Sequence, residues 1–316
     1  MDGPTPLQCW RRLSDSIGVQ IWAKRDDALS LGLGGNKIRK LDLILGRARQ
    51  DAVDTILTTG GLQSNHCRLT AAAAASVGMG CTLFLRADPP VANEGNILLD
   101  QLFGAELIYT GTVTYEDVDE LMLAHATNIS RVGGHPLVIP LGAATTEGTV
   151  AYVEAVEELA LQCESQGVDP RTIIVAVGSG STFAGIRLGV ERYLPQVQVI
   201  GVSASWAAEK VRAVSIKLIL DTCAFLDLET SLTAQDLDIR TNYIGPGYTI
   251  ATSGARTALH LVAATEGVLL DLTYTGKACH ALMDLAKRGE LRGPVIFWHT
   301  GGFPELFARV PADLSE

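Results

Sequence analysis

The feature that most constrains the fold of this 316-residue chain is the alternation of short apolar runs with longer helical patterns. Runs rich in β-branched residues, without regular polar positions, are typical of strands buried on both faces of a parallel sheet. Because helical patterns separate these runs, the sequence predicts an α/β fold with right-handed crossovers. The predicted strands cover residues 54–58, 81–85, 106–109, 137–140, 172–177, 197–202 and 295–298.

Helical patterns fill the intervals between these strands. The predicted helices cover residues 64–76, 95–103, 115–129, 149–162, 182–192 and 277–287. We expect two open parallel-sheet α/β domains. The smaller comprises residues 45–145, and the larger combines residues 1–44 with residues 146–316. A ligand site is expected between them, since domain interfaces favour such sites.

Composition excludes several classes of function. The formal charge of −10 disfavours nucleic-acid binding, because an acidic surface repels a phosphate backbone. No apolar run approaches about 18 residues, and no signal peptide is recognised at the N-terminus, so no membrane association is expected. The six cysteines form no C-x-x-C pair, which predicts free thiols and a cytoplasmic protein.

The sequence also lacks the patterns of a metal site and of a serine hydrolase. The six histidines have no glutamate or cysteine at ligand spacing, so no metal site is expected. The chain also lacks the G-x-S-x-G element of a serine hydrolase.

A glycine- and serine-rich turn follows the predicted strand 172–177 and opens a helix. Its small residues allow an anion to approach backbone N–H groups at the positive end of the helix dipole. It lacks the lysine of a Walker loop and the third glycine of a dinucleotide-binding turn. Phosphate binding and a plain helix-capping turn both fit this segment. The turn consists of Gly178, Ser179, Gly180, Ser181 and Thr182.

Lys37 follows two glycines and an asparagine at the start of a helical pattern. Burial there would lower the pKa of its amine and favour covalent reaction with an aldehyde cofactor. The alternative is that Lys37, Arg39 and Lys40 form a solvated basic first turn, because lysines are seldom buried. The residues alone leave both interpretations open.

Three glycine-rich turns follow predicted strands, at residues 60–61, 178–180 and 301–302. Ligands of open α/β sheets bind beyond the carboxyl ends of strands, so these turns could form one site. After the first turn, Ser64 or Asn65 could cap a helix or help its N–H groups hold a carboxylate. Tyr248 and Tyr274 lie in predicted loops, where tyrosines usually pack with a solvated hydroxyl.

Five segments in order, GGNKIRKL, GGLQSNH, GSGSTFAG, GPGY and the pair YTGK and HTGG, carry a family resemblance. The chain resembles the D-cysteine desulfhydrase and 1-aminocyclopropane-1-carboxylate (ACC) deaminase family of pyridoxal-phosphate (PLP) enzymes. The similarity runs from PTPL at residues 4–7 and KRDD at 24–27 to Pro304. It implies the tryptophan-synthase-β-like fold, PLP fold type II, a small amino-acid substrate and a homodimer.

The resemblance also implies roles for individual residues. The lysine that binds the cofactor aldehyde corresponds to Lys37, and the turn 178–182 corresponds to the phosphate site. Asn65 matches a residue that binds the ring oxygen, and Tyr274 matches the tyrosine that stacks on the ring. The other residues implied at the cofactor or the substrate are Ser64, His66, Tyr248, Thr275 and Thr300, with Thr275 placed near the pyridine nitrogen.

Two threonines favour the desulfhydrase branch. ACC deaminases resemble YEGK and HLGG where this chain has Thr275 and Thr300. A hydroxyl beside the ring nitrogen gives a milder electron sink than a carboxylate, which suffices to expel a good leaving group. The expected reaction is elimination from D-cysteine to pyruvate, sulfide and ammonia. Lys37 is expected to move the Cα proton, and Ser64, Tyr248 or Tyr274 the proton on sulfur.

Residues 250–252 and 272–273 depart from the family pattern, which bears on the substrate rather than on PLP. A carbon–sulfur lyase specialised for a cysteine conjugate, an L-cysteate sulfo-lyase and an ACC deaminase are therefore the alternatives. A catalytically silent PLP-binding protein is the non-enzyme alternative, because a fold alone does not fix a function.

Overall fold

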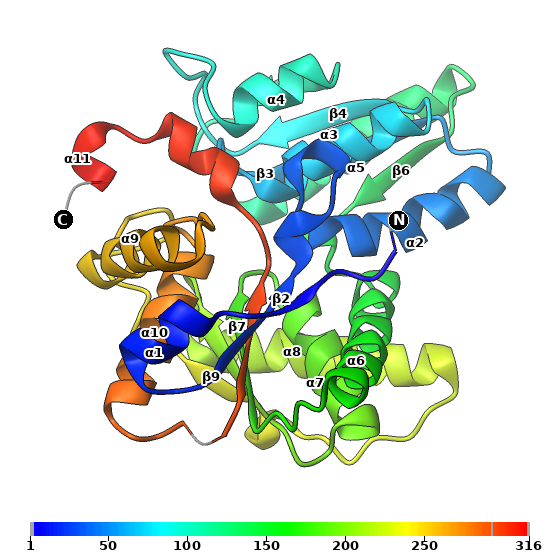
Figure 1. Cartoon of the computed structure of the whole chain (residues 1–316). Coiled ribbons are helices and arrows are strands. Elements are labelled where there is room, and N and C mark those ends of the chain that lie inside the picture. Colours follow the sequence, from blue (N-terminus) through cyan, green and yellow to red (C-terminus); the bar gives the residue numbers. More distant parts are fainter. Residues whose placement is uncertain (1–2, 292, 315–316) are drawn as a thin grey trace.

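The computed structural model describes residues 3–291 and 293–314 and contains two separate β-sheets (Figure 1). Residues 1–2, 292 and 315–316 of the predicted domain ranges lie outside the described residues. The expected α/β architecture is confirmed, because helices connect and cover two predominantly parallel sheets.

The larger sheet has six strands in the order β1-β2-β10-β7-β8-β9. Its neighbours pair in parallel except for β1 and β2, which are antiparallel. The strands are β1 (Leu7–Cys9), β2 (Ile21–Arg25), β7 (Thr172–Val177), β8 (Gln198–Ser203), β9 (Asp238–Arg240) and β10 (Val295–His299).

The smaller sheet has four parallel strands in the order β5-β4-β3-β6. These are β3 (Thr55–Gly60), β4 (Gly80–Leu85), β5 (Glu106–Tyr109) and β6 (Pro136–Ile139). All four lie inside the range 45–145 expected for the smaller domain. The expected boundary at residue 45 falls within a helix, α2 (Lys37–Gln50), that contacts α3 and α6.

Helices lie on both faces of each sheet. In addition to α2 they are α1 (Arg11–Ile17), α3 (Asn65–Ser76), α4 (Asn96–Leu102), α5 (Tyr115–Arg131), α6 (Thr146–Gln166), α7 (Ser181–Tyr193), α8 (Ala208–Leu226), α9 (Ser253–Glu266), α10 (Thr275–Lys287) and α11 (Pro311–Leu314). Among the described helices, none combines the length and the apolar character that crossing a bilayer requires.

Strand β7 shows how the core is organised. All six of its residues are buried, as its unbroken apolar sequence predicts. Alternate side chains point to opposite faces, so Ile173 and Val175 pack with α6, α7 and α8. Ile174 and Ala176 pack in a second core with α1, α9 and α10. In the smaller sheet, α2 and α3 cover one face and α5 covers the other.

Candidate active site

A cavity of about 260 Å³ lies between the two sheets, at the carboxyl ends of β3, β7 and β10. The turns that follow these strands contribute Gly61, Gly178 and Thr300 to its wall, as their positions in the sequence predict. Most of the predicted site residues are brought together here. They are Lys37, Ser64, Asn65, His66, Gly178, Ser179, Gly180, Thr182, Tyr248, Tyr274 and Thr300.

Lys37 is the first residue of α2 and borders the cavity. Its Nζ donates a hydrogen bond to Oδ1 of Asn36 over 3.0 Å. Burial and the nearby Arg68 guanidinium lower the pKa of the Lys37 amine to about 8, against an opposing effect of Asp271. A much larger fraction of this amine is therefore neutral near pH 7 than for a solvated lysine.

The alternative of a solvated basic turn is wrong for the neighbours of Lys37. Arg39 and Lys40 are only 2% and 1% exposed. Lys40 Nζ donates to Ser181 Oγ (2.7 Å) and to the carbonyl of Gly142 (3.2 Å). Burial, together with the charge of Lys37, holds the pKa of Lys40 well below its usual value. The first turn of α2 is thus packed against the larger sheet's helices instead of facing water.

The predicted phosphate turn leads directly into α7. Its Gly180 has φ of 97°, a conformation that glycine adopts without strain. Thr182 Oγ1 accepts a hydrogen bond from Asn36 Nδ2 over 3.0 Å. The first N–H groups of a helix lack partners within the helix, so the start of α7 offers donors to an anion. Ser181 itself is buried behind the wall, where it accepts from Lys40 and donates to the carbonyl of Ala143.

At the start of α3, Ser64 caps the helix and also borders the cavity. Its Oγ accepts from the N–H of Cys67 over 3.2 Å. The His66 ring contacts two hydroxyls, with Nε2 2.7 Å from Thr58 Oγ1 and Nδ1 3.4 Å from Thr70 Oγ1. Burial and the two nearby lysine charges lower the pKa of His66, so its ring is neutral. Both ring nitrogens therefore have protein partners.

The two predicted tyrosines form a hydrogen-bonded pair. Their hydroxyl oxygens lie 2.6 Å apart, and their rings meet edge to face at a centroid distance of 5.9 Å. Burial raises the pKa of both phenols, which keeps them protonated. The Tyr274 ring lies beside Gly178, where a Cβ would approach Tyr274 Cε1 to 3.1 Å.

Thr275 does not border the cavity, in contrast to Thr300. Its hydroxyl donates to Asp271 Oδ1 and accepts from the N–H of Asp271. Asp271 also accepts from the N–H of Tyr274 over 3.0 Å. Burial and the nearby Glu305 raise the pKa of Asp271 to about 7. Thr275, the threonine expected near the pyridine nitrogen, therefore does not reach the cavity, whereas Thr300, which is also expected at the cofactor, does.

Sequence reasoning did not identify several side chains that belong to the site. Asp271 orients the turn that contains Tyr274, because its carboxylate accepts from the N–H groups of Tyr274 and Thr275 at the start of α10. An aspartate three or four residues before the start of a helix is a sequence signal for such a contact. Other residues that border the cavity were also missed, two beside Lys37 in the same segment and three that distant segments bring there. They are Asn36, Lys40, Arg86, Tyr115 and Trp206.

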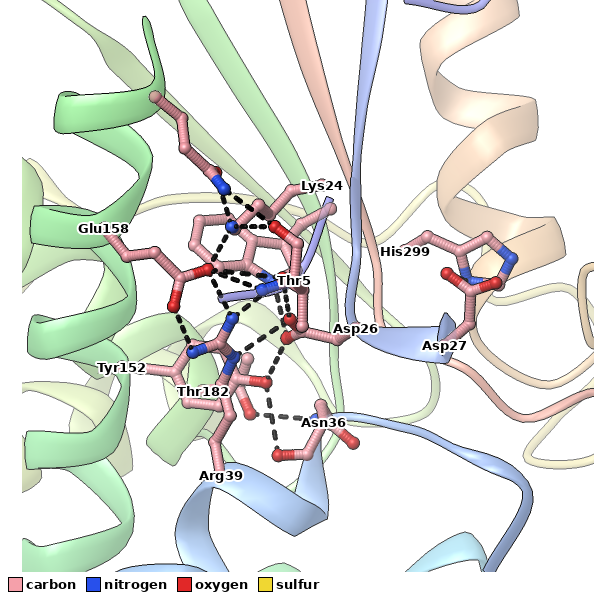
Figure 2. Close-up of polar contacts among 12 residues, drawn as sticks. Thr5, Lys24, Asp26, Asp27, Asn36, Arg39, Tyr152, Glu158, Thr182 and His299 are labelled. Carbon is pink, nitrogen blue, oxygen red and sulfur yellow. Dashed lines mark hydrogen bonds and ion pairs between the residues drawn. The ribbon is translucent and has the colours of Figure 1, made fainter. Parts of the chain in front are cut away.

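A buried polar network lies behind Asn36 (Figure 2). Asp26 accepts hydrogen bonds from Arg39 (2.9 Å), Trp298 Nε1 (2.8 Å) and the Tyr152 hydroxyl (2.6 Å). Burial alone would raise the pKa of Asp26, but Arg39 and these donors lower it. The Tyr152 hydroxyl also lies 3.2 Å from the carbonyl oxygen of Asn36. The network therefore connects the turn after β2, α6 and β10 to the residue that precedes Lys37.

All six cysteines are free thiols, and none of them borders the cavity. Cys9 is partly exposed, whereas Cys67, Cys81, Cys163, Cys223 and Cys279 are buried. Burial raises the pKa of the thiols of Cys67 and Cys279, which disfavours their reactive thiolate forms. Free thiols are the expected outcome of their scattered positions.

Among the described residues that line the cavity there is no carboxylate, whereas Lys37, Lys40 and Arg86 contribute N–H donors to its wall. The donor set thus suits an anionic ligand, and the neutral fraction of the Lys37 amine suits an aldehyde. The fold and the cavity together define an α/β enzyme built to hold an aldehyde cofactor that carries a phosphate.

Comparison with known proteins agrees with this class. Residues 1–301 match the family described as "Pyridoxal-phosphate dependent enzyme". The chain belongs to this family, and PLP is its cofactor. The expected fold type and family resemblance are confirmed.

Two curated relatives are D-cysteine desulfhydrases, from Salmonella choleraesuis (strain SC-B67) and Salmonella schwarzengrund (strain CVM19633). Each is 39% identical to this chain, over 98% of the chain and 94% of the relative. A solved structure of an ACC deaminase homologue is 34% identical with a TM-score of 0.90, covering 97% of this chain and 91% of its own. A threonine deaminase from Solanum lycopersicum is 16% identical with a TM-score of 0.66, and the match covers 94% of this chain and 79% of its own. This likeness shows the fold alone.

Proposed function

We propose that this protein is a PLP-dependent carbon–sulfur lyase that converts D-cysteine to pyruvate, sulfide and ammonia. The observation that carries the proposal is one cavity that combines the Lys37 amine, the start of α7 and the Tyr248–Tyr274 hydroxyl pair. The extended similarity to D-cysteine desulfhydrases supports it.

The residues that line the cavity suit the aldehyde, the phosphate and the ring of PLP. Lys37 Nζ would bind the aldehyde, while Lys40, Thr182 and the first N–H groups of α7 would hold the phosphate. Tyr274 would lie against the ring, and Thr300 is the hydroxyl available to it. When bound, PLP withdraws electrons from the substrate Cα and stabilises the charge left by removal of its proton.

The chain's own groups would then direct the elimination. Ser64 and the N–H groups at the start of α3 bind the substrate carboxylate, with Asn65 beside them. Lys37 Nζ takes the Cα proton once it is free. The Cβ–S bond breaks with its electron pair on sulfur, so that hydrosulfide leaves, and the Tyr248–Tyr274 pair donates a proton to it to give hydrogen sulfide and regains that proton from water. Water then hydrolyses the released aminoacrylate to pyruvate and ammonia.

The test is a turnover assay on purified protein loaded with PLP, using D-cysteine, L-cysteine, L-cysteate and ACC. Equal amounts of pyruvate and sulfide from D-cysteine support the proposal. The structural similarity to an ACC deaminase homologue makes ACC the second candidate substrate. Release of 2-oxobutanoate from ACC, without sulfide from either cysteine, would replace the proposed activity. PLP binding with no product from any substrate would support the silent PLP-binding protein.

A cytoplasmic location and a homodimer belong to the same proposal. The free thiols support a reducing compartment. The dimer rests on the family resemblance. Light scattering coupled to gel filtration tests it, with twice the mass of the 316-residue chain as the expected result.

A further inference from the structure

Tyr248 lies in an irregular loop, residues 241–252, that joins β9 to α9. Its hydroxyl is 2.6 Å from that of Tyr274, although the loop supplies no regular backbone ladder to fix it there. The next residue, Thr249, has φ of 64°, a left-handed conformation that a β-branched residue rarely adopts. Such a conformation persists where surrounding contacts enforce it. The loop therefore depends on other segments to hold Tyr248 in place.

Arg309, in the C-terminal segment, supplies one such contact. Its Nη1 donates to the carbonyl oxygen of Thr249 over 2.7 Å. Its Nη2 donates to Thr273 Oγ1 over 3.2 Å. Thr249 directly follows Tyr248, and Thr273 directly precedes Tyr274. One guanidinium therefore bridges the residues that stand beside the two tyrosines of the hydroxyl pair.

Glu305 fixes this guanidinium and the segment before Tyr274 together. The side chain of Glu305 is 1% exposed, and its Oε1 accepts from Arg309 Nη2 over 3.1 Å. The same oxygen accepts from the N–H groups of Leu272 and Thr273 over 3.0 and 3.2 Å. Its Oε2 accepts from Thr273 Oγ1 over 2.7 Å. Hydrogen bonds between charged groups are strong and directional, so Arg309 has one defined orientation toward the loop.

A buried lysine holds the loop at the residue before Tyr248. Lys277 lies in the first turn of α10 and is fully buried. Its Nζ donates to the carbonyl oxygens of Gly247 over 3.0 Å and Ala204 over 3.3 Å. The carbonyl groups on both sides of Tyr248 thus accept hydrogen bonds from side chains of distant segments, Lys277 before it and Arg309 after it.

We propose that Arg309 and Lys277 are positioning residues that hold the backbone on both sides of Tyr248, so that its hydroxyl pair with Tyr274 can donate a proton to the departing sulfur. This inference rests on the proposed function, in which that pair is the acid. Both side chains lie outside the lining of the cavity, so they act through Tyr248 and not on the substrate. A small displacement of an acid strongly lowers its contribution to the rate.

The choice of leaving group separates positioning of the acid from general support of the fold. Hydrosulfide leaves D-cysteine and takes a proton from the tyrosine pair. Chloride leaves β-chloro-D-alanine with the bonding electron pair and needs no proton. A displaced Tyr248 should therefore slow elimination from D-cysteine more than elimination from β-chloro-D-alanine. Damage to the fold or to the cofactor site would slow both reactions equally.

The test measures pyruvate formation from these two substrates by the PLP-loaded enzyme and compares their kcat/KM values as a ratio. In R309M and in K277M we expect the ratio of D-cysteine to β-chloro-D-alanine to fall about tenfold or more, part of the contribution of a positioned acid. Y248F should lower the ratio too, and R309M should add little further loss in Y248F, because effects that act through one group are not additive. R309K should restore part of the ratio, since it keeps the charge without the fork.

Hydrogen exchange read by mass spectrometry tests the hold on the loop without catalysis. In R309M the amides of residues 241–252 should exchange faster than in the wild type, because the loop has lost a contact. The amides of β7 should keep their wild-type rates, which shows that the larger sheet is intact. If R309M does not fold, R309K and K277M answer the same two questions.

The matched control is R288M. Arg288 pairs with Asp284, four residues earlier, over 3.1 Å, as Arg309 pairs with Glu305, but it directly follows α10 and lies outside the cavity lining. Its substrate ratio and loop exchange should equal those of the wild type. Equal losses for both substrates in R309M and K277M, or an unchanged ratio, would overturn the inference and leave the proposed function standing. No pyruvate from D-cysteine in the wild type would overturn the proposed function, and the inference with it.

Discussion

Lys37 differs from a surface lysine because α2 begins with it at the edge of the cavity. We expect K37A to lose the absorption band of lysine-bound PLP and to lose activity by about 10²–10⁴-fold, the usual contribution of a positioned base. K287A is the control, since Lys287 is an exposed lysine in the last turn of α10. A normal band in K37A would assign the cofactor to another amine.

The lowered pKa of Lys37 gives a pH dependence with a definite sign. The deprotonated amine attacks the aldehyde, and the pKa of about 8 lies below the usual 10.5. The rate at which PLP-free enzyme takes up PLP should therefore rise with pH and level off above about pH 8. Stopped-flow absorbance measures this rate, with Nα-acetyl-lysine as the reference amine. A midpoint near that of the reference would contradict the burial of Lys37.

At the scale of residues, the sequence predicted those site residues that belong to local motifs. Lys37, Ser64 and the turn before α7 were found because a glycine turn meets the start of a helix. The burial of Lys40 and the paired nitrogens of His66 were not predicted. Both depend on contacts between segments far apart in the chain, which local patterns do not record.

At the scale of elements, the turn before α7 has no room for a side chain at Gly178, because the Tyr274 ring lies against it. In G178A the new Cβ would meet Tyr274 Cε1 at 3.1 Å, so the ring must shift. We expect the Kd for PLP to rise about tenfold, with little loss of stability, because ring stacking of this kind contributes about 0.5–1.5 kcal/mol. Equilibrium dialysis with PLP measures the affinity.

The matched control for this substitution is G46A, within α2. A Cβ there meets nothing within 4 Å. Alanine in a helix interior should raise the free energy of unfolding by about 0.5–1 kcal/mol and leave PLP affinity unchanged. Equal PLP affinities of G178A and the wild type would show that Tyr274 does not support the ring.

Elements with a long apolar run or a clear apolar period were predicted, and elements with a weaker pattern were missed. The predicted range 172–177 is identical to that of β7, whose residues are all buried. Strands β1 and β9 have three residues each, too few to show a period. The sequence also did not reveal α8, where Leu220 and Phe225 are more than half exposed. Apolar residues on its solvent side obscure the stripe that identifies a surface helix.

At the scale of the whole molecule, the network around Asp26 joins distant segments behind the site (Figure 2). Y152F removes the hydroxyl that donates to Asp26 and keeps the ring that packs against Trp298. We expect a loss of about 1.5–3 kcal/mol in the free energy of unfolding, the range for hydrogen bonds to charged groups. Urea denaturation measures the loss. Y193F should change it little, since Tyr193 is partly exposed at the end of α7.

The placement of the cysteines has a practical consequence. The cavity wall contains no sulfhydryl, and five of the six are enclosed in packed interior. Hydrogen sulfide formed at the centre would meet no neighbouring thiol or disulfide with which to exchange as it escapes. The rate at which iodoacetamide labels the five buried cysteines therefore measures how often the packed interior opens to solvent.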